Sequence, residues 1–436
     1  MRHRRPGSRD GVLTSGVLLA KSSWRLVLAI VAMVPLLALT TYEPRPLSSP
    51  IAEPIVVPAP DVADDVWQSR GRVVSQQPYT PPLDDPDTVL GEAWRAIYTS
   101  VSGIDGSPRE VSGAFFLPRG APPADGWPVI SLAHGTTGIG NKCGPAQQPD
   151  LQGYSPIVEA LLANNYAVAL TDYEGLGENG SHPYLEPRTA AFNTIDAVRA
   201  LRGISPSVST RWVAVGHSQG GQSVWAADEL NNFYGDGLQF LGSVALAPAA
   251  NVTGVADLAW SRSMTDEQRA LFPLLLVGLA RYNPQLDERA FLRGWTQTDS
   301  AWLSQCESTG SPASLAPTAL VPWQGVVDRV SESNDLRPDT PHDADELREA
   351  LRKIALPQGQ LSAPMLVVTG LDDSLVLPRW VAAAVAQSCA LGGQIEYVEV
   401  PNAHHGDILW KRSALVAKWI ADRFSGVAAP SNCTGS

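Results

Sequence analysis

The 436-residue sequence predicts an α/β fold in which helices flank a mostly parallel sheet on both faces. From Pro128 onward, short apolar stretches alternate with longer helical patterns, which is typical of strand–helix–strand units. Stretches such as YAVALT at 166–171 are apolar along almost their whole length, as in strands buried on both faces. Hydrophobic residues make up 44% of the chain and charged residues 17%, so a large core can form and global disorder is excluded.

The strands and helices of the core follow one another along two stretches, 91–249 and 364–436. The first pair of strands is joined at the turn Asp105-Gly106. Strands are expected over 96–101, 110–117, 128–133, 166–171, 212–215, 240–247, 364–369 and 395–400, and helices over 156–164, 190–202, 219–230, 380–390 and 414–424.

One long interruption, residues 250–363, separates two strands of the sheet. We expect it to be a helical cap, inserted before the strand that leads to the acidic pair at 372–373. Caps of this kind lie above the carboxyl ends of the strands, where ligands bind. Residues 271–280 (LFPLLLVGLA) are apolar nearly all round, so they either line a ligand site or pack as the core of the cap. Helical patterns lie at 266–282, 287–294, 312–321 and 343–354.

The first 42 residues have the layout of a signal peptide or an N-terminal membrane anchor. An apolar run from Leu26 to Thr40 follows a basic segment. Residues 43–90 begin with a proline-rich stretch and indicate a linker, or a strap lying over the domain. The chain has a net charge of −12, which argues against binding to nucleic acid.

The sequence contains four cysteines, at positions 143, 306, 389 and 433. An even number in an exported chain indicates disulfide bonds, with three pairings open. No C-x-x-C pair is present, and no third ligand accompanies the histidine pair at 404–405, so we expect no metal site.

The strongest chemical signal is Gly216-x-Ser218-x-Gly220, which matches a nucleophile elbow. An apolar strand precedes this motif and a helical pattern follows it. In an elbow, the serine occupies a strained strand-to-helix turn, and the two glycines allow tight packing around it. The hydroxyl then projects at the positive end of the following helix. Ser218 is therefore the expected nucleophile.

A serine nucleophile needs a base and an orienting acid, and with this elbow the acid and then the histidine follow it in the chain. Asp372 and Asp373 come directly after a buried strand, and the common loop spacing favours Asp373. His404 and His405 follow the last strand, and the distance from the preceding proline favours His405. Asp372 and His404 stay as alternates. His182 lies in a surface-like loop and is not expected to take part.

An oxyanion hole is predicted at the turn that follows the strand at 128–133. The sequence there contains His-Gly-Thr, and such a turn supplies one backbone N–H to a developing oxyanion. The second N–H comes from the residue after the nucleophile. This assigns Thr136 and Gln219 as donors, and the Thr136 hydroxyl could add a third. His134 is expected to brace the loop.

These motifs and their surroundings resemble the secretory lipase family of the α/β-hydrolases. The resemblance covers roughly 96–427, and its most specific stretches are 97–118, 126–143 (GWPVISLAHGTTGIGNKC) and 214–221 (AVGHSQGG). It implies an α/β-hydrolase fold and hydrolysis of acyl esters, often triacylglycerols, under a helical cap without a cofactor.

By position, the resemblance also implies roles for individual residues. Ser218 becomes the nucleophile, Asp373 the acid and His405 the base, with Thr136 and Gln219 as oxyanion donors. It further implies two disulfide bonds, Cys143–Cys306 and Cys389–Cys433.

The expected function is hydrolysis of acylglycerol esters by a secreted lipase, through a Ser-His-Asp triad and an acyl-enzyme intermediate. A short-chain esterase or an acyltransferase would use the same triad, and a catalytically idle binding protein could share the fold. The expected partner is a lipid or other acyl-ester substrate, with transient contact at a lipid interface through a mobile cap. We expect the protein outside the cell, either free or tethered by an uncleaved N-terminal segment, and nothing in the sequence indicates its oligomeric state.

Overall fold

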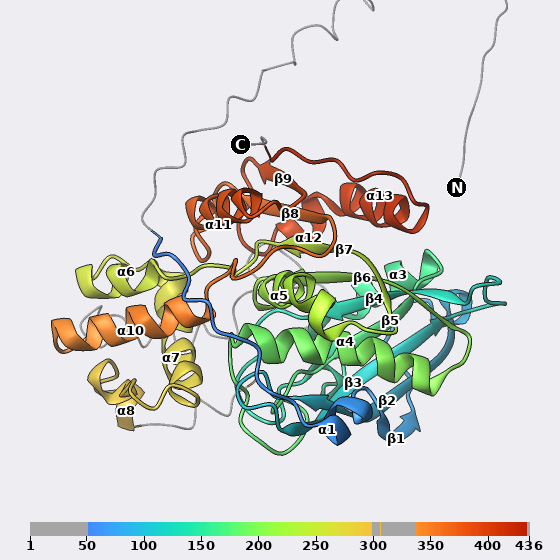
Figure 1. Cartoon of the computed structure of the whole chain (residues 1–436), viewed down its shortest axis with the longest axis horizontal. Coiled ribbons are helices and arrows are strands. Elements are labelled where there is room, and N and C mark those ends of the chain that lie inside the picture. Colours follow the sequence, from blue (N-terminus) through green and yellow to red (C-terminus); the bar gives the residue numbers. More distant parts are fainter. Residues whose placement is uncertain (1–50, 299–305, 307–335, 434–436) are drawn as a thin grey trace, which may run out of the picture. The chain divides into compact units, whose positions relative to one another are not determined.

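The computed structural model describes residues 51–298, 306 and 336–433, and their core is a nine-stranded sheet (Figure 1). The strand order is β1-β2-β3-β5-β4-β6-β7-β8-β9. The first three strands pair antiparallel, as do β3 and β5, whereas all later neighbours are parallel. The strands are β1 (Val73–Pro78), β2 (Leu90–Val101), β3 (Pro108–Pro118), β4 (Trp127–Ala133), β5 (Ala167–Thr171), β6 (Val208–His217), β7 (Gln239–Leu246), β8 (Met365–Gly370) and β9 (Ile395–Val400).

Helices cover both faces of this sheet because alternate residues of its central strands are buried on opposite sides. In β4, Val129 and Ala133 belong to one buried cluster, and Ile130 and Leu132 belong to the other. The first cluster includes side chains from α4 (Pro187–Ile204), α5 (Gln219–Tyr234) and α11 (Pro378–Ala390), and the second includes side chains from α3 (Ser155–Ala163), α12 (Ile408–Lys411) and α13 (Ser413–Phe424).

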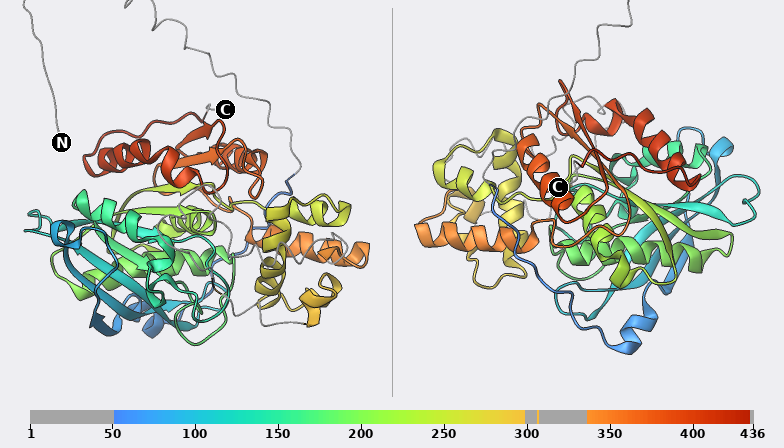
Figure 2. Two further views of the ribbon diagram at one scale, coloured as in Figure 1. Left: turned by 180° about the vertical axis from the view of Figure 1, so that it is seen from behind. Right: turned by 45° about the horizontal axis from the view of Figure 1, so that its top comes forward.

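A group of helices between β7 and β8 lies together at one side of the sheet, and both sets of views agree on this placement (Figures 1 and 2). The described α-helices of this group are α6 (Val255–Ser261), α7 (Asp266–Ala280), α8 (Trp295–Thr298) and α10 (Pro341–Ile354). The two longest of them, α7 and α10, each begin at a capping box, formed by Thr265 with Gln268 and by Thr340 with Asp343.

Each helix and strand predicted for the core is present, with ends that differ by up to six residues, whereas the short helix α12 was not predicted. The helix expected over 287–294 is instead a single 3₁₀ turn at Glu288–Ala290, which Asp287 caps at its start. Gly294, at the end of the expected helix, adopts a left-handed φ of 58° that is not helical. The helix expected over 312–321 and the apolar run of the first 42 residues lie outside the described residues. No helix within 51–298 or 336–433 combines the length and apolar character that a membrane span requires.

The segment expected as a linker or strap contains both an extended stretch and regular structure. Residues 51–63, the N-terminal strap, run past the helices between β7 and β8 toward α1 (Asp64–Ser69), as Figure 1 shows. Within the strap, the Ile55 N–H donates to the Arg352 carbonyl (2.8 Å), and the Pro58 carbonyl accepts from Arg188 (2.9 Å). Further along, β1 forms the edge of the sheet. This strand is not predicted from the sequence, because all but one of its residues are exposed and no apolar run marks it.

Two disulfide bonds join the four cysteines, in the pairing that the family resemblance implies. Cys143, in the loop after β4, is bonded to Cys306 with a Cα–Cα distance of 5.0 Å. Cys389, at the end of α11, is bonded to Cys433 with a Cα–Cα distance of 5.4 Å. The second bond therefore fixes the C-terminal tail beside the helix that precedes β9.

Candidate active site

Ser218 occupies the turn between β6 and α5. Its φ of 58° and ψ of −114° are a strained combination for a residue with a side chain. The turn is held by backbone hydrogen bonds, since the Ser218 N–H donates to the Leu246 carbonyl (2.9 Å) and its own carbonyl accepts from Ala249 (3.0 Å). The sequence-predicted elbow is thus present in the structure, with the serine at the start of a helix.

The glycines on either side of Ser218 are required by close backbone approach. A Cβ added at Gly216 would lie 2.2 Å from the Gly220 carbonyl oxygen. A Cβ added at Gly220 would lie 2.0 Å from the carbonyl oxygen of Ala133, at the end of β4. No side chain fits at either distance, so both glycines are necessary for the turn to pack against the sheet.

Asp373 and His405 form a buried pair across two loops that follow β8 and β9. The His405 Nδ1–H donates to Asp373 Oδ2 (2.7 Å), and the two side chains are 2% and 0% exposed. The other carboxylate oxygen accepts from the backbone N–H groups of Leu375 and Val376, both at 2.9 Å. With Nδ1 donating, Nε2 is the basic nitrogen, and it is buried without a hydrogen-bond partner in the described part of the chain.

The alternates, Asp372 and His404, are exposed and make a different contact. His404 Nδ1 donates to the backbone carbonyl of Asp372 (3.0 Å) rather than to a carboxylate. The doubled residues therefore separate into a buried pair and a surface pair.

His405 lies next to the nucleophile strand. The His217 Nε2–H donates to the His405 carbonyl (3.0 Å), and the two rings are 4.7 Å apart. Burial lowers the pKa of His217 to about 3, so this ring is neutral and serves as a structural contact. Because Ser218 directly follows His217 in the chain, the contact brings the loop after β9 to the elbow.

The candidate oxyanion donors come from two different elements. Gln219 is the first residue of α5, and Thr136 follows β4 in the loop 134–139, the oxyanion loop. Tyr173 donates to the carbonyl of His134 (3.0 Å), and burial lowers the pKa of His134 to about 4. A neutral, enclosed His134 agrees with the bracing role expected from the sequence.

A family comparison adds an independent observation: the model of the secretory lipase family matches residues 150–432. The chain belongs to the secretory lipase family. It is accordingly a secreted carboxylic-ester hydrolase. No curated protein sequence matches the chain.

Several solved structures have the same fold. Candida antarctica lipase A in its closed state superimposes with a TM-score of 0.65 at 16% identity, covering 87% of this chain and 90% of that one. The rice cell wall degrading esterase LipA from Xanthomonas oryzae gives a TM-score of 0.63 at 19% identity, with 80% and 97% covered. A putative hydrolase from Legionella pneumophila gives 0.62 at 18% identity, with 81% and 97% covered. The chain has the α/β-hydrolase fold.

In this lipase family member, Ser218 opens onto a mostly apolar cavity of about 60 Å³. One wall is formed by Leu375 and Val376, whose N–H groups hold the Asp373 carboxylate, so the loop that carries the acid also borders this cavity. The other wall belongs largely to α7, which contributes Gln268, Leu271, Phe272 and Leu275. The strongly apolar stretch noted in the sequence therefore lines the site on one side.

His182 is buried beside the site, contrary to the expectation that it lies at the surface. It is 2% exposed, and its Nε2 accepts a hydrogen bond from the side-chain amide of Gln219 (2.9 Å). Its Nδ1–H donates to the Glu174 carbonyl (2.8 Å), and burial lowers its pKa to about 3. The surrounding polar sequence hides this contact, which depends on a residue 37 positions away. No local signal in the sequence could have revealed it.

Proposed function

We propose that this secreted hydrolase cleaves acylglycerol esters with Ser218 as nucleophile, His405 as base and Asp373 as the orienting acid. The observation that carries the proposal is the buried 2.7 Å contact between His405 and Asp373, which leaves Nε2 without a hydrogen-bond partner in the described part of the chain. The His405 carbonyl accepts from His217, the residue that precedes the strained elbow serine. An imidazole fixed in this tautomer is suited to take a proton from a serine hydroxyl.

The first half of the reaction forms an acyl-enzyme. His405 Nε2 accepts the Ser218 proton while Oγ attacks the ester carbonyl carbon, and Asp373 stabilises the resulting imidazolium. The N–H groups of Thr136 and Gln219 donate to the oxyanion of the tetrahedral intermediate. The bond to the alcohol then breaks, and the alcohol leaves with the proton held by His405.

The second half repeats these steps with water in place of the serine. Water loses a proton to His405 as its oxygen attacks the acyl carbon, and collapse of the intermediate returns that proton to Ser218 Oγ. The carboxylic acid is released and the free serine is regenerated.

The apolar wall supports a lipid substrate. Leu271, Phe272 and Leu275 of α7 face the cavity beside Ser218 and present a surface that an acyl chain can contact. A cavity of about 60 Å³ has room for only a few atoms. We therefore propose that residues 250–363 act as a cap whose displacement admits the acyl chain. Contact with a lipid interface would be transient and made through this cap.

Residues 1–42 are proposed to direct export, as a cleaved signal peptide or as a retained tether on the outer side of the membrane. The core would then comprise 91–249 and 364–436, with 43–90 as the segment that leads into it.

Initial rates on p-nitrophenyl esters from acetyl to palmitoyl test the proposal. The protein would begin at residue 45, which keeps the N-terminal strap, and Ser218→Ala is the control. We expect the maximum rate at long chains and no rate above background in the control. A maximum at acetyl or butyryl would replace the lipase with a short-chain esterase. Absence of Ser218-dependent turnover on every ester, together with no labelling by a fluorophosphonate, would overturn the hydrolase mechanism.

A further inference from the structure

One loop contacts both candidate oxyanion donors. The β5–α4 loop, residues 172–186, carries His182 and Tyr184 two positions apart. Tyr184 Oη lies 2.7 Å from Thr136 Oγ1, and His182 Nε2 lies 2.9 Å from the side-chain amide of Gln219. The two donors belong to elements that are far apart in sequence, and this single loop joins them.

We propose that Tyr184 is a positioning residue whose hydroxyl donates to Thr136 Oγ1, so that the Thr136 hydroxyl proton is free to reach the oxyanion. The inference rests on the proposed function and names the residue that makes Thr136 a side-chain donor as well as a backbone donor. Tyr184 itself is not required to touch the substrate carbonyl.

The direction of this hydrogen bond follows from the chemistry of the two hydroxyls. A phenol is more acidic than an aliphatic alcohol, so the tyrosine is the better donor and the threonine oxygen the better acceptor. A hydroxyl that accepts such a bond becomes a stronger donor through its own proton, because neighbouring hydrogen bonds polarise one another. Thr136 would therefore offer the oxyanion a strengthened O–H in addition to its N–H.

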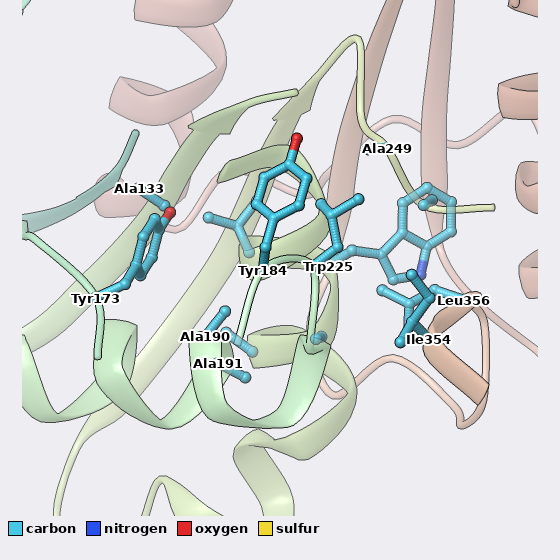
Figure 3. Close-up of a cluster of buried hydrophobic side chains, with 14 of the residues drawn as sticks. Ala133, Tyr173, Tyr184, Ala190, Ala191, Trp225, Ala249, Ile354 and Leu356 are labelled. Atoms are coloured by element: carbon cyan, nitrogen blue, oxygen red, sulfur yellow. The ribbon is translucent and has the colours of Figure 1, made fainter. Parts of the chain in front are cut away.

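Tyr184 is held in one orientation by its surroundings. Tyr184 is 4% exposed, and its ring centroid lies 6.1 Å from that of His182. Its hydroxyl points away from Ala190 and Ala191 (Figure 3). It also lines the cavity next to Ser218. A hydroxyl fixed at this depth has little freedom to turn away from Thr136.

The C-terminal end of α7 secures the loop from the other side. A Cβ added at Gly278 would lie 2.5 Å from Tyr184 Cβ, so the helix backbone packs directly against the tyrosine. Tyr282 Oη donates to the Tyr184 carbonyl (2.8 Å), and Arg281 donates to the carbonyls of His182 (2.9 Å) and Ile139 (3.0 Å). The oxyanion loop, the β5–α4 loop and α7 thus form one contact network.

The test compares Tyr184→Phe with Tyr98→Phe. The Tyr98 hydroxyl also lies 2.7 Å from a threonine hydroxyl, that of Thr171, but in the core between β2 and β5. We expect Tyr184→Phe to lower kcat by about 10- to 100-fold with little change in KM, less than the loss of a direct oxyanion donor. A trifluoromethyl ketone, which mimics the tetrahedral intermediate, should bind more weakly by a similar factor. Tyr98→Phe should change neither quantity, although both variants lose a buried hydroxyl.

Variants of Thr136 form the second part of the test. Thr136→Val removes the donor hydroxyl itself and should lower kcat more than Tyr184→Phe does. The double variant should lose little more than Thr136→Val alone, because the Tyr184 hydroxyl acts through that of Thr136. Thr136→Ser keeps a hydroxyl and should lose less than Thr136→Val. If Tyr184→Phe does not fold, the comparison of Thr136→Ser with Thr136→Val in the presence of Tyr184 decides.

Three results would overturn the inference: kcat of Tyr184→Phe within twofold of the parent, equal losses in Tyr184→Phe and Tyr98→Phe, or fully additive losses in the double variant. Failure of the proposed function gives a different result, because the unsubstituted protein would then not react with a fluorophosphonate at Ser218.

Discussion

Backbone atoms hold Ser218 in the elbow, whereas side-chain contacts hold His405 and Thr136 in the loops that face it. The elbow is closed by glycines whose added Cβ atoms would lie 2.2 Å and 2.0 Å from backbone oxygens. The facing loops depend on hydroxyl, imidazole and amide contacts, one of which comes from Gln268 of α7. A substitution in the elbow should therefore disturb folding first, whereas one in the facing loops should disturb catalysis first.

The largest expected effect is a loss of activity when the side-chain contact that holds His405 is broken. Asp373→Asn should lower kcat by about 10⁴-fold, because an amide no longer fixes the base tautomer of His405. Thermal stability should change far less. Initial rates on a p-nitrophenyl ester, together with a melting curve, measure both quantities.

The neighbouring surface residues are the matched controls. Asp372→Asn and His404→Gln alter exposed side chains that are adjacent in sequence to the buried pair. Each should retain the parent rate. A large loss in Asp372→Asn with activity kept in Asp373→Asn would reverse the assignment of the acid.

The next largest effect is expected in the elbow, where backbone atoms pack closely around Ser218. Gly220→Ala should destabilise the fold by about 3 kcal/mol or more, because the new methyl would lie 2.0 Å from the Ala133 carbonyl oxygen. Urea unfolding measures this loss. Gly203→Ala is the control, since its Cβ would come no closer than 3.6 Å to Val73. Equal stability of the two variants would contradict the packing argument.

The dependence of unfolding free energy on pH tests the side-chain contacts of the facing loops, through the buried His182. Its pKa is about 3 in the fold, against an ordinary value of 6.5. Below pH 6.5 the unfolded chain binds a proton that the folded chain does not, so this group contributes a loss of stability as pH falls. His182→Asn should reduce the slope of unfolding free energy against pH by up to about 1.4 kcal/mol per pH unit between pH 6 and 4.

Urea unfolding at several pH values measures that slope. His134 and His217 also have lowered pKa values, about 4 and about 3, so some acid sensitivity should persist in the variant. A variant slope equal to that of the parent would show that His182 is protonated in the fold.

The smallest effect concerns the start of α7. Thr265 caps this helix and also donates to the Ser374 carbonyl (2.9 Å) in the loop that carries Asp373. Thr340 caps α10 in the same way. Thr265→Ala and Thr340→Ala should each cost about 1 kcal/mol of stability. Only Thr265→Ala should also lower kcat, by a few-fold. Equal rates in the two variants would show that the contact between α7 and the loop carrying Asp373 does not affect catalysis.

Much of the nucleophile side could be predicted from the sequence because its determinants are local. The strand, Ser218 and both glycines lie within a few residues of one another, and the motif itself contains the glycines that the close backbone approach requires. The pair Asp373 and His405 could be favoured over Asp372 and His404 by loop spacing, and the structure joins that pair at 2.7 Å.

The remaining features depend on contacts between distant residues. Tyr184 and His182 have no recognisable pattern around them, and their partners lie 48 and 37 positions away. Strand β1 was missed because an exposed edge strand lacks an apolar run. The 287–294 pattern gave only a 3₁₀ turn at its start, and Gly294 at its far end has a left-handed φ that a helix does not contain.

The N-terminal strap limits how the chain can be processed. Ala52 donates to Thr253 (2.9 Å), Ile55 to the Arg352 carbonyl (2.8 Å) and Val57 to Gln358 (2.9 Å), so residues on both sides of the inserted helices hold it. A protease that removes a leader before Ile51 leaves these bonds intact. Cleavage after residue 63 would separate the strap's contacts with the inserted helices and with Arg188 of α4 from the rest of the chain, so any cleavage that removes a leader is expected to precede Ile51.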